Sequence, residues 1–218
     1  MIIGCRDPPK CRTNDGLISY LANQEAISNK TRKAMKKVDR INYIPKKEEL
    51  SKRRAYWDSP QSIGHEVTIS QPSLVGKMID SLELQSMNNV LEIGTGSAYN
   101  AAIISKLLPY GKLTTVERVN SLGKRAKKLL KSDKNVTVII GDAMNHKYKH
   151  KFDRIIVTAE ILDKKQIDQL IKLAGAYSVI IVPYLNILYK ITKCGENNVV
   201  SKKLLSVRFV PVLKGIAK

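Results

Sequence analysis

Three positions in this sequence have the residue types and spacing that could hold a nucleoside cofactor. The apolar run Val90–Ile93 leads directly into the turn Gly94-Thr95-Gly96-Ser97. Glu117 follows the next apolar run, and Gly141-Asp142 follows the third. Glycines let a ligand approach the backbone closely, and a carboxylate at the end of a second strand can accept both hydroxyls of a ribose. A carboxylate at the third position can accept from an adenine amino group.

A helix is expected directly after the glycine turn, and its free N–H groups and dipole would attract an anion. The carboxylate of a methionine part would suit that position, so the pattern predicts a site for S-adenosyl-L-methionine. The glycine turn alone is weak evidence, because dinucleotide enzymes also use one. Glu117 could instead be a surface acid, and Asp142 a turn former. Three successive strand ends facing one crevice favour a ligand site over these alternatives.

The elements that must position these groups follow from the spacing of apolar residues. From Asn89 onward, short apolar runs alternate with segments of helical spacing, which is typical of βαβ units with a parallel sheet. Two final runs predict a terminal antiparallel pair. The expected fold class is α/β, a Rossmann-like sheet with helices on both faces. The predicted strands are 90–93, 113–116, 136–140, 155–157, 179–182, 187–192 and 204–212, and the predicted helices are 98–108, 121–130 and 165–173.

The chain before this alternation is expected to form helices. Ser28 is predicted to cap one helix, and Pro72 to lie near the first position of another. Between them, residues 56–64 are expected to form a linker. We therefore expect an N-terminal helical extension that includes a lid segment for substrate and cofactor, residues 1–72. The methyltransferase α/β domain would be residues 73–218, and the two parts would form one compact unit.

Composition sets limits on class and location. The chain has 218 residues, enough for one large domain with its own core. No apolar stretch reaches the roughly 18 residues that a membrane helix needs, and the N-terminus lacks the apolar core of a secretory signal. We therefore expect a cytoplasmic protein without a membrane partner. The cysteines are Cys5, Cys11 and Cys194, and their spacing predicts reduced thiols and no metal site.

The net charge is +19, from 38 basic and 19 acidic residues. The excess of basic residues is concentrated in 30–54 and 124–134. A basic surface can bind phosphate backbones, but no basic run alternates with aromatic residues, and helical spacing also fits a solvated face. We therefore expect at most non-specific, salt-dependent binding of nucleic acid.

Two further segments complete a more specific pattern, Asp58-Ser59-Pro60-Gln61-Ser62-Ile63-Gly64 and Thr68-Ile69-Ser70-Gln71-Pro72. With residues 92–97, 141–142, 153–159 and 207–211, they make the sequence resemble the protein-L-isoaspartate O-methyltransferases. The resemblance extends from about Gly16 to Gly215. It implies a cytosolic repair enzyme that uses S-adenosyl-L-methionine to methylate the free carboxylate of L-isoaspartyl residues in proteins. It also implies that the last strands are ordered differently from the common methyltransferase pattern.

The resemblance implies roles for particular positions. Ser70 falls on the residue usually named as the active-site serine, where it would hold the substrate carboxylate; its alternative role is to cap the following helix. That carboxylate is ionised above about pH 4, so alignment and water exclusion matter more than a general base. The positions expected to bind the cofactor are Thr68, Ile69, Gly94, Thr95, Gly96, Ser97, Asn100, Glu117, Arg118, Gly141, Asp142, Ala143 and Thr158.

The sequence departs from the family pattern in small ways on the cofactor side and more strongly on the substrate side. On the cofactor side, Ala98 and Ala143 replace glycines, which is tolerable if φ is negative at both. Glu160 stands where small apolar residues are usual. If its carboxylate faces the pocket, it would disfavour a substrate carboxylate. Otherwise it would point to solvent or pair with Lys164 or Lys165, as a loop carboxylate beside lysines usually does.

Two alternatives stay open at this point. The chain could be a relative that methylates another carboxylate or an RNA, although no target-base motif of the Asn/Asp-Pro-Pro-Tyr type is present. It could also be a non-catalytic binding protein that uses its basic surface. The intact Ser70 and cofactor positions argue against the second alternative.

Overall fold

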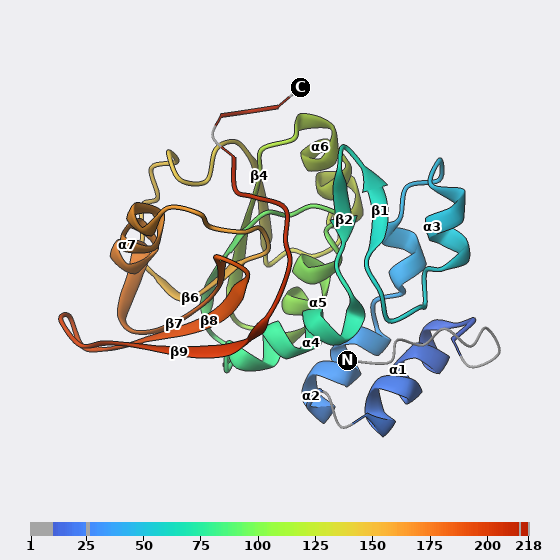
Figure 1. The fold of residues 1–218 in the computed structure, drawn as a ribbon, viewed down its shortest axis with the longest axis horizontal. Helices are drawn as coiled ribbons and strands as arrows, with labels where there is room; N and C mark the ends of the chain where they lie inside the picture. Colours follow the sequence, from blue (N-terminus) through green and yellow to red (C-terminus); the bar gives the residue numbers. More distant parts are fainter. Residues whose placement is uncertain (1–10, 25–26, 214, 218) are drawn as a thin grey trace.

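In the computed structural model, which describes residues 11–24, 27–213 and 215–217, seven strands form one sheet in the order β5-β4-β3-β6-β7-β8-β9 (Figure 1). A two-stranded hairpin lies beside it. The strands are β1 (Gln61–Gly64), β2 (Val67–Ile69), β3 (Asn89–Ile93), β4 (Lys112–Glu117), β5 (Val136–Ile140), β6 (Phe152–Val157), β7 (Ala174–Tyr184), β8 (Ile187–Cys194) and β9 (Val199–Ser206).

The pairing confirms the expected α/β class with an antiparallel end. Strands β3 to β7 pair in parallel, whereas β8 pairs antiparallel with β7 and β9 pairs antiparallel with β8. The last three strands therefore lie side by side in chain order. Because the parallel strands all end at the same edge, the loops after β3, β4, β5 and β6 meet there.

Helices cover both faces of the sheet, as predicted. Adjacent strand residues alternate between two hydrophobic clusters. Val90 and Ile156 belong to the cluster shared with α4, α5 and α6, and Leu91 and Ile155 to the cluster shared with α7. The helices are α1 (Asn14–Asn23), α2 (Asn29–Lys36), the 3₁₀ helix η1 (Arg40–Tyr43), α3 (Glu49–Arg53), α4 (Pro72–Ser81), α5 (Tyr99–Leu107), α6 (Asn120–Leu129) and α7 (Lys164–Leu173).

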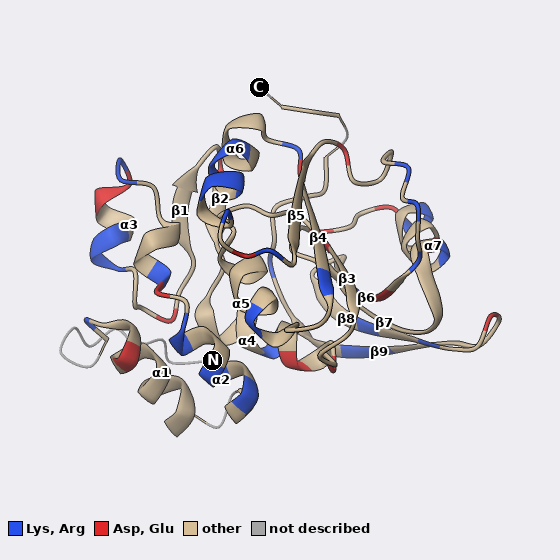
Figure 2. Cartoon of the chain, turned by 180° about the vertical axis from the view of Figure 1, so that it is seen from behind, with Lys and Arg blue, Asp and Glu red and all other residues tan. Residues whose placement is uncertain are grey.

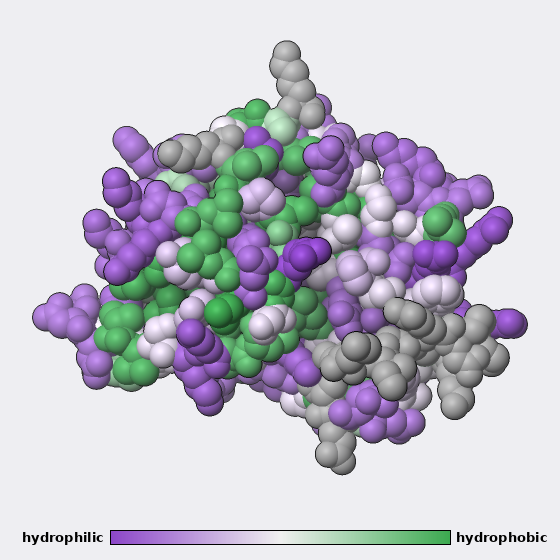
Figure 3. Space-filling model, in the orientation of Figure 1, coloured by the Kyte–Doolittle hydropathy of each residue, from purple (hydrophilic) through white to green (hydrophobic). Residues whose placement is uncertain are grey.

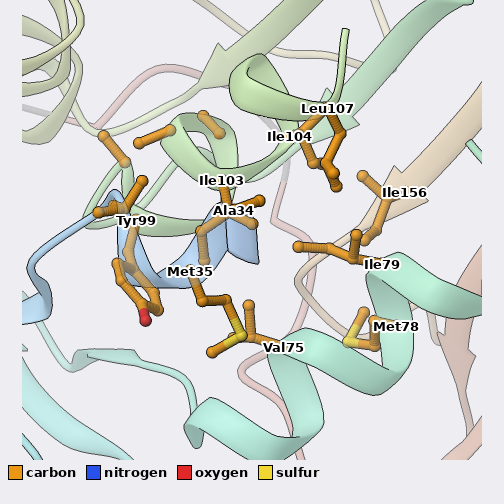
Figure 4. Close-up of a cluster of buried hydrophobic side chains, with 14 of the residues drawn as sticks. Ala34, Met35, Val75, Met78, Ile79, Tyr99, Ile103, Ile104, Leu107 and Ile156 are labelled. Atoms are coloured by element: carbon orange, nitrogen blue, oxygen red, sulfur yellow. The ribbon is translucent and has the colours of Figure 1, made fainter. Parts of the chain in front are cut away.

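The N-terminal helices pack on the same face as α4 and α5. Figure 4 shows Met35 of α2 beside Val75 of α4, with Ile103 of α5 close by. Ser28 caps α2 as predicted, because its side chain accepts a hydrogen bond from the Thr31 N–H. After these helices the chain forms the hairpin β1–β2, and β2 lies beside the carboxyl edge of the sheet.

Two predicted boundaries are wrong. The expected linker 56–64 contains β1, which pairs antiparallel with β2. The last strand, expected at 204–212, is β9 at Val199–Ser206. Its first residues are exposed on both faces, so they carry no apolar alternation that could mark the strand. The segment 207–213 leaves the sheet instead.

The expectation of three reduced thiols is wrong for Cys11, which is disulfide-bonded, whereas Cys194 is a free, exposed thiol. Cys5 lies outside the described residues. Among the described residues, no helix is long and apolar enough to cross a membrane, and no group of three His, Cys, Asp or Glu side chains could hold a metal ion.

The start of α5 departs from the backbone expected there. Ala98, the N-cap of α5, has φ of +71° and ψ of +4°, so the negative φ under which alanine would replace glycine without strain is not present here. The chain must turn sharply from the glycine turn into α5, and a left-handed residue makes that turn. A side chain in this conformation costs about 1–2 kcal/mol. Ala143, in contrast, is not among the residues with positive φ.

We therefore expect Ala98→Gly to raise the free energy of unfolding by about 0.5–1 kcal/mol, since relief of strain outweighs the loss of one buried methyl group. Ala102→Gly, inside the same helix and equally buried, is the control and should lower it by about 2 kcal/mol, from helix propensity together with the loss of a buried methyl group. Urea unfolding of both variants measures the difference. A loss of stability in Ala98→Gly equal to that in Ala102→Gly would contradict the strain at this position.

Candidate active site

A cavity of about 850 Å³ opens at the carboxyl edge of the sheet. This volume lies in the range of small-molecule sites. Ser70 and every position expected to bind the cofactor line this cavity, so the structure brings all of them together. Those positions are Thr68, Ile69, Gly94, Thr95, Gly96, Ser97, Asn100, Glu117, Arg118, Gly141, Asp142, Ala143 and Thr158.

The glycine turn forms part of the cavity wall and requires glycine. Gly94 has φ of +95° and Gly96 has φ of +53°, both in the left-handed region. A Cβ on Gly94 would lie 2.5 Å from Oγ1 of Thr158. The Thr158 hydroxyl donates hydrogen bonds to the carbonyls of Ile93 and Gly94. The turn is thereby held with bare backbone toward the cavity, which fits the close approach of a cofactor.

Glu117 closes the glycine turn from the neighbouring strand. Its Oε2 accepts from the Gly96 N–H at 2.7 Å, and its Oε1 accepts from the Val119 N–H at 2.8 Å. The side chain is buried but lines the cavity. Each carboxylate oxygen has a second lone pair, so the group can still accept from ribose hydroxyls. The sequence suggested only the ligand role and missed this structural one.

Asp142 is similarly engaged with the backbone at the end of β5. Its carboxylate accepts from the Met144 N–H at 3.0 Å, the Gly215 N–H at 2.8 Å and the Asn145 amide at 2.8 Å. Partial burial by itself raises the pKa of Asp142, but these hydrogen bonds outweigh it and hold the pKa below its ordinary value. The group is therefore a fixed anion at the edge of the cavity.

Glu92, inside β3, supports the site from below and was not proposed as a site residue. Its Oε1 accepts from the Asn100 amide at 2.6 Å, and its Oε2 accepts from the Thr115 hydroxyl at 2.5 Å. The Thr115 hydroxyl also lies 2.6 Å from that of Thr95. Burial raises the pKa of Glu92 to about 7, opposed by these hydrogen bonds and reinforced by the charge of Glu117. The sequence feature that could have identified Glu92 is the presence of a carboxylate within an otherwise apolar strand.

The Ser70 hydroxyl faces the cavity and makes no hydrogen bond to any residue that the structure describes. Its expected alternative role is wrong, because the N-cap of α4 is Gln71 and no side chain caps at that position. Asp58 accepts a hydrogen bond from a free backbone N–H group at the start of α4 instead. Its carboxylate accepts from the Ser73 N–H at 2.8 Å and the Gln71 amide at 3.1 Å.

These contacts explain why the two most specific sequence segments occur together. The first supplies Asp58 and strand β1, and the second supplies β2 and the start of α4. Gln61 pairs with Ile69 across the hairpin, and Asp58 bonds to Ser73 just beyond it. The two segments are one structural unit that presents Ser70 to the cavity.

Glu160 takes neither of its expected positions. It is buried rather than solvated, it does not line the cavity, and no ion pair with Lys164 or Lys165 is present among the described residues. Its carboxylate accepts from the Asn186 N–H in the turn between β7 and β8. Repulsion of a substrate carboxylate by Glu160 therefore has no support in the structure.

The C-terminal segment forms a wall of the cavity that the sequence did not suggest as ligand-lining. Residues 205–213 line it, and the backbone of Glu160 is bonded to Val210 and Val212, both at 2.7 Å. Figure 1 shows this segment crossing in front of the carboxyl edge. Figure 3 shows hydrophobic residues gathered over this part of the face, with hydrophilic residues around the rim. The segment and the hairpin enclose the site from two sides.

A Rossmann-like sheet with this glycine turn, and carboxylates at the next two strand ends around one cavity, defines an S-adenosylmethionine-dependent methyltransferase. The family described as protein-L-isoaspartate(D-aspartate) O-methyltransferase (PCMT) matches residues 12–217. The chain belongs to this family.

Curated relatives agree with that placement, and a solved structure has the same fold. A protein-L-isoaspartate O-methyltransferase of Ignicoccus hospitalis is 40% identical over 190 residues, covering 83% of this chain and 87% of the relative. One from Fervidobacterium nodosum is 40% identical over 196 residues, covering 85% and 94%. The fold matches a Plasmodium falciparum structure of the same description, solved with S-adenosyl-L-homocysteine, with a TM-score of 0.81 and 23% identity over 93% of this chain and 99% of the other.

The raised pKa of Glu92 predicts a pH dependence of stability. Its folded-state pKa of about 7 exceeds the ordinary value of 4.5, so the folded state binds more protons between these values. The free energy of unfolding should therefore fall as pH rises through this window, by about 3 kcal/mol from this group.

Glu92→Gln should flatten this slope between pH 4.5 and about pH 7, because the amide does not titrate. Glu49→Gln, at an exposed position on α3, is the control and should leave the slope unchanged. Denaturant unfolding across this pH range measures both. The same slope in Glu92→Gln and the unmodified protein would show that Glu92 does not retain its proton.

Proposed function

We propose that this enzyme transfers a methyl group from S-adenosyl-L-methionine to the free carboxylate of L-isoaspartyl residues in damaged proteins, the step that starts their repair. The main support is the Ser70 hydroxyl, which lies in the same cavity as the glycine turn and has no hydrogen bond to other described residues. Asp58 holds the segment that contains Ser70 through its hydrogen bond with the Ser73 N–H. Family membership and the names of the relatives support the same reaction.

The cofactor would lie along the edge formed by β3, β4 and β5. The turn Gly94–Ser97 and the start of α5 would receive the methionine part, since free N–H groups there suit its carboxylate. Glu117 would accept from the ribose hydroxyls, and Asp142 from the adenine amino group. When bound, S-adenosyl-L-methionine supplies an electron-poor methyl group on a sulfonium sulfur. None of these side chains needs to move a proton.

Ser70 would act by alignment. Its hydroxyl would donate a hydrogen bond to one oxygen of the substrate carboxylate, leaving the other oxygen directed at the methyl carbon. The carboxylate is already ionised at neutral pH, so no general base is required. The hairpin β1–β2 and the segment 207–213 would exclude water around the reacting groups, which strengthens such charged contacts.

The direct test is methyl transfer to an isoaspartyl peptide beside its aspartyl twin. Transfer to the first alone is the expected result. Transfer to neither, with transfer to RNA or to another carboxylate, would favour the second candidate, a relative with a redirected substrate. Binding of the cofactor without methyl transfer to any of these substrates would favour the other alternative, a non-catalytic binding protein.

The net positive charge of the chain suggests a second kind of partner, polyanions such as nucleic acids. Figure 2 shows Lys and Arg spread over several elements, including α2, α3, α6 and β9. A charge of +19 that is spread in this way suits weak, non-specific contact with polyanions, lost as salt rises to physiological levels. We place the enzyme in the cytoplasm, where ageing proteins supply its substrate, without a metal or a membrane partner.

Ser70→Ala should lower kcat about 10- to 100-fold, the loss of one hydrogen bond to a charged group, while the Kd for S-adenosyl-L-homocysteine stays nearly constant. Ser81→Ala, at the far end of α4 and outside the cavity, is the matched control. Steady-state kinetics with an isoaspartyl peptide and calorimetry measure the two quantities. An unchanged kcat would remove Ser70 from the reaction.

Glu117→Gln should weaken binding of S-adenosyl-L-homocysteine by about 2 kcal/mol, because an N–H₂ group replaces one acceptor and faces a backbone N–H or a ribose hydroxyl. Glu196→Gln, an exposed position in the turn between β8 and β9, is the control. Calorimetric titration gives both affinities. Equal affinity in the two variants would exclude Glu117 from the cofactor site.

A further inference from the structure

Arg40 is a fully buried arginine close to Ser70 in the fold. Its Nε donates to the Ala55 carbonyl at 2.8 Å, and its Nη2 lies 3.4 Å from the carbonyls of both Ser59 and Ile69. One guanidinium thus bonds three points of the backbone. These points are the chain after α3, the chain before β1, and the last residue of β2.

The buried charge of Arg40 is costly and is not compensated by an ion pair within the part of the chain that the structure describes, so a contribution to stability does not explain this residue. Burial lowers its pKa to about 10, so it keeps its charge at neutral pH. Among the described residues it has no carboxylate at ion-pair distance, and Nη1 has no hydrogen-bond partner. Its charge is balanced by the carbonyls, by the more distant Asp58, and by the face of Tyr99, 5.1 Å away. Apolar residues often replace buried ions without loss of stability, so the geometry is what requires arginine.

The contacts of Arg40 bracket Ser70. The carbonyl of Ile69, which Arg40 holds, belongs to the residue immediately before Ser70. On the other side, Asp58 holds Gln71 and Ser73. Ser70 is therefore suspended between two anchored points, with its own side chain free.

Arg40 also links this segment to the cofactor side. Tyr99, whose ring lies under the guanidinium, is the first residue of α5 and is separated from the glycine turn by Ala98 alone. A displacement of the guanidinium would therefore change the position of the Ser70 segment relative to the start of α5.

We propose that Arg40 is a positioning residue that sets the distance of the Ser70 hydroxyl from the methyl donor. The proposal rests on the proposed function, in which Ser70 contacts the substrate carboxylate. A planar guanidinium presents its donors in a fixed fork, whereas a lysine offers one flexible ammonium that does not hold three carbonyls in the same arrangement. Arg40→Lys keeps the charge and removes this arrangement.

The expected result for Arg40→Lys is a kcat lower by about 10- to 100-fold, because small misplacements of reacting groups have effects of this size. The Kd for S-adenosyl-L-homocysteine should change less than about threefold, since Arg40 does not line the cavity. Arg154→Lys is the matched control. Arg154 also donates to backbone carbonyls, those of Leu82 and Glu83, but outside the cavity, so its kcat should stay within about twofold.

A double variant separates positioning from general destabilisation. If Arg40 acts through Ser70, the pair Arg40→Lys and Ser70→Ala should have the kcat of Ser70→Ala alone, within about twofold. Multiplicative losses would overturn the proposal. If Arg40→Lys does not fold, Asp58→Asn tests the other anchor in the same cycle, with the same expected result and the same contradicting one.

Amide hydrogen exchange supplies a readout that does not depend on activity. Arg40→Lys should speed exchange in residues 69–73 more than Arg154→Lys does, and equal exchange would overturn the proposal. A wild-type protein that methylates no isoaspartyl peptide would refute the proposed function, and exchange would then decide the role of Arg40 by itself.

Discussion

The hydrogen bond between the Gly96 N–H and the Glu117 carboxylate is the contact on which the rest of the site depends. It joins the turn after β3 to the end of β4 at 2.7 Å. A turn with bare glycine backbone has no side chains to hold it, so its shape must come from neighbours. Glu117 supplies this from one side and Thr158, at the end of β6, from the other. The cavity exists because adjacent parallel strands end at one edge and exchange these contacts.

The three carboxylates of this edge are held by different means, although they lie close together in a strongly basic protein. Asp142 receives hydrogen bonds that favour its charged form, and Glu117 is held in place by the N–H groups of Gly96 and Val119. Glu92 is buried beneath them, and burial together with the charge of Glu117 favours its neutral form around neutral pH. The site thus has two carboxylates held by backbone N–H groups at the cavity wall, and one group below them that titrates. This arrangement limits repulsion between neighbouring acids and leaves the acceptors where a nucleoside could use them.

Departures from the family pattern are absorbed by the structure in different ways. Ala98 keeps the backbone that glycine would adopt, at a cost in strain. Glu160 turns away from the cavity and bonds to the Asn186 N–H, where it ties the end of β6 to the turn between β7 and β8. A carboxylate at the carboxyl edge can therefore serve the scaffold rather than the ligand. The residues that enclose the substrate side come from the hairpin and from 207–213, two segments that are distant in sequence.

The sequence by itself determined the alternation of strands and helices, the glycine turn, and the carboxylates at strand ends. These depend on local periodicity and on the rule that parallel strands end at a common edge. Only the tertiary structure decided the strand β1 within the expected linker, the left-handed backbone of Ala98, the disulfide at Cys11, and the direction of Glu160. It also decided that Arg40 lies against the Ser70 segment. These features depend on the path of the backbone and on which groups the fold brings into contact, and the residue types along the chain do not record either.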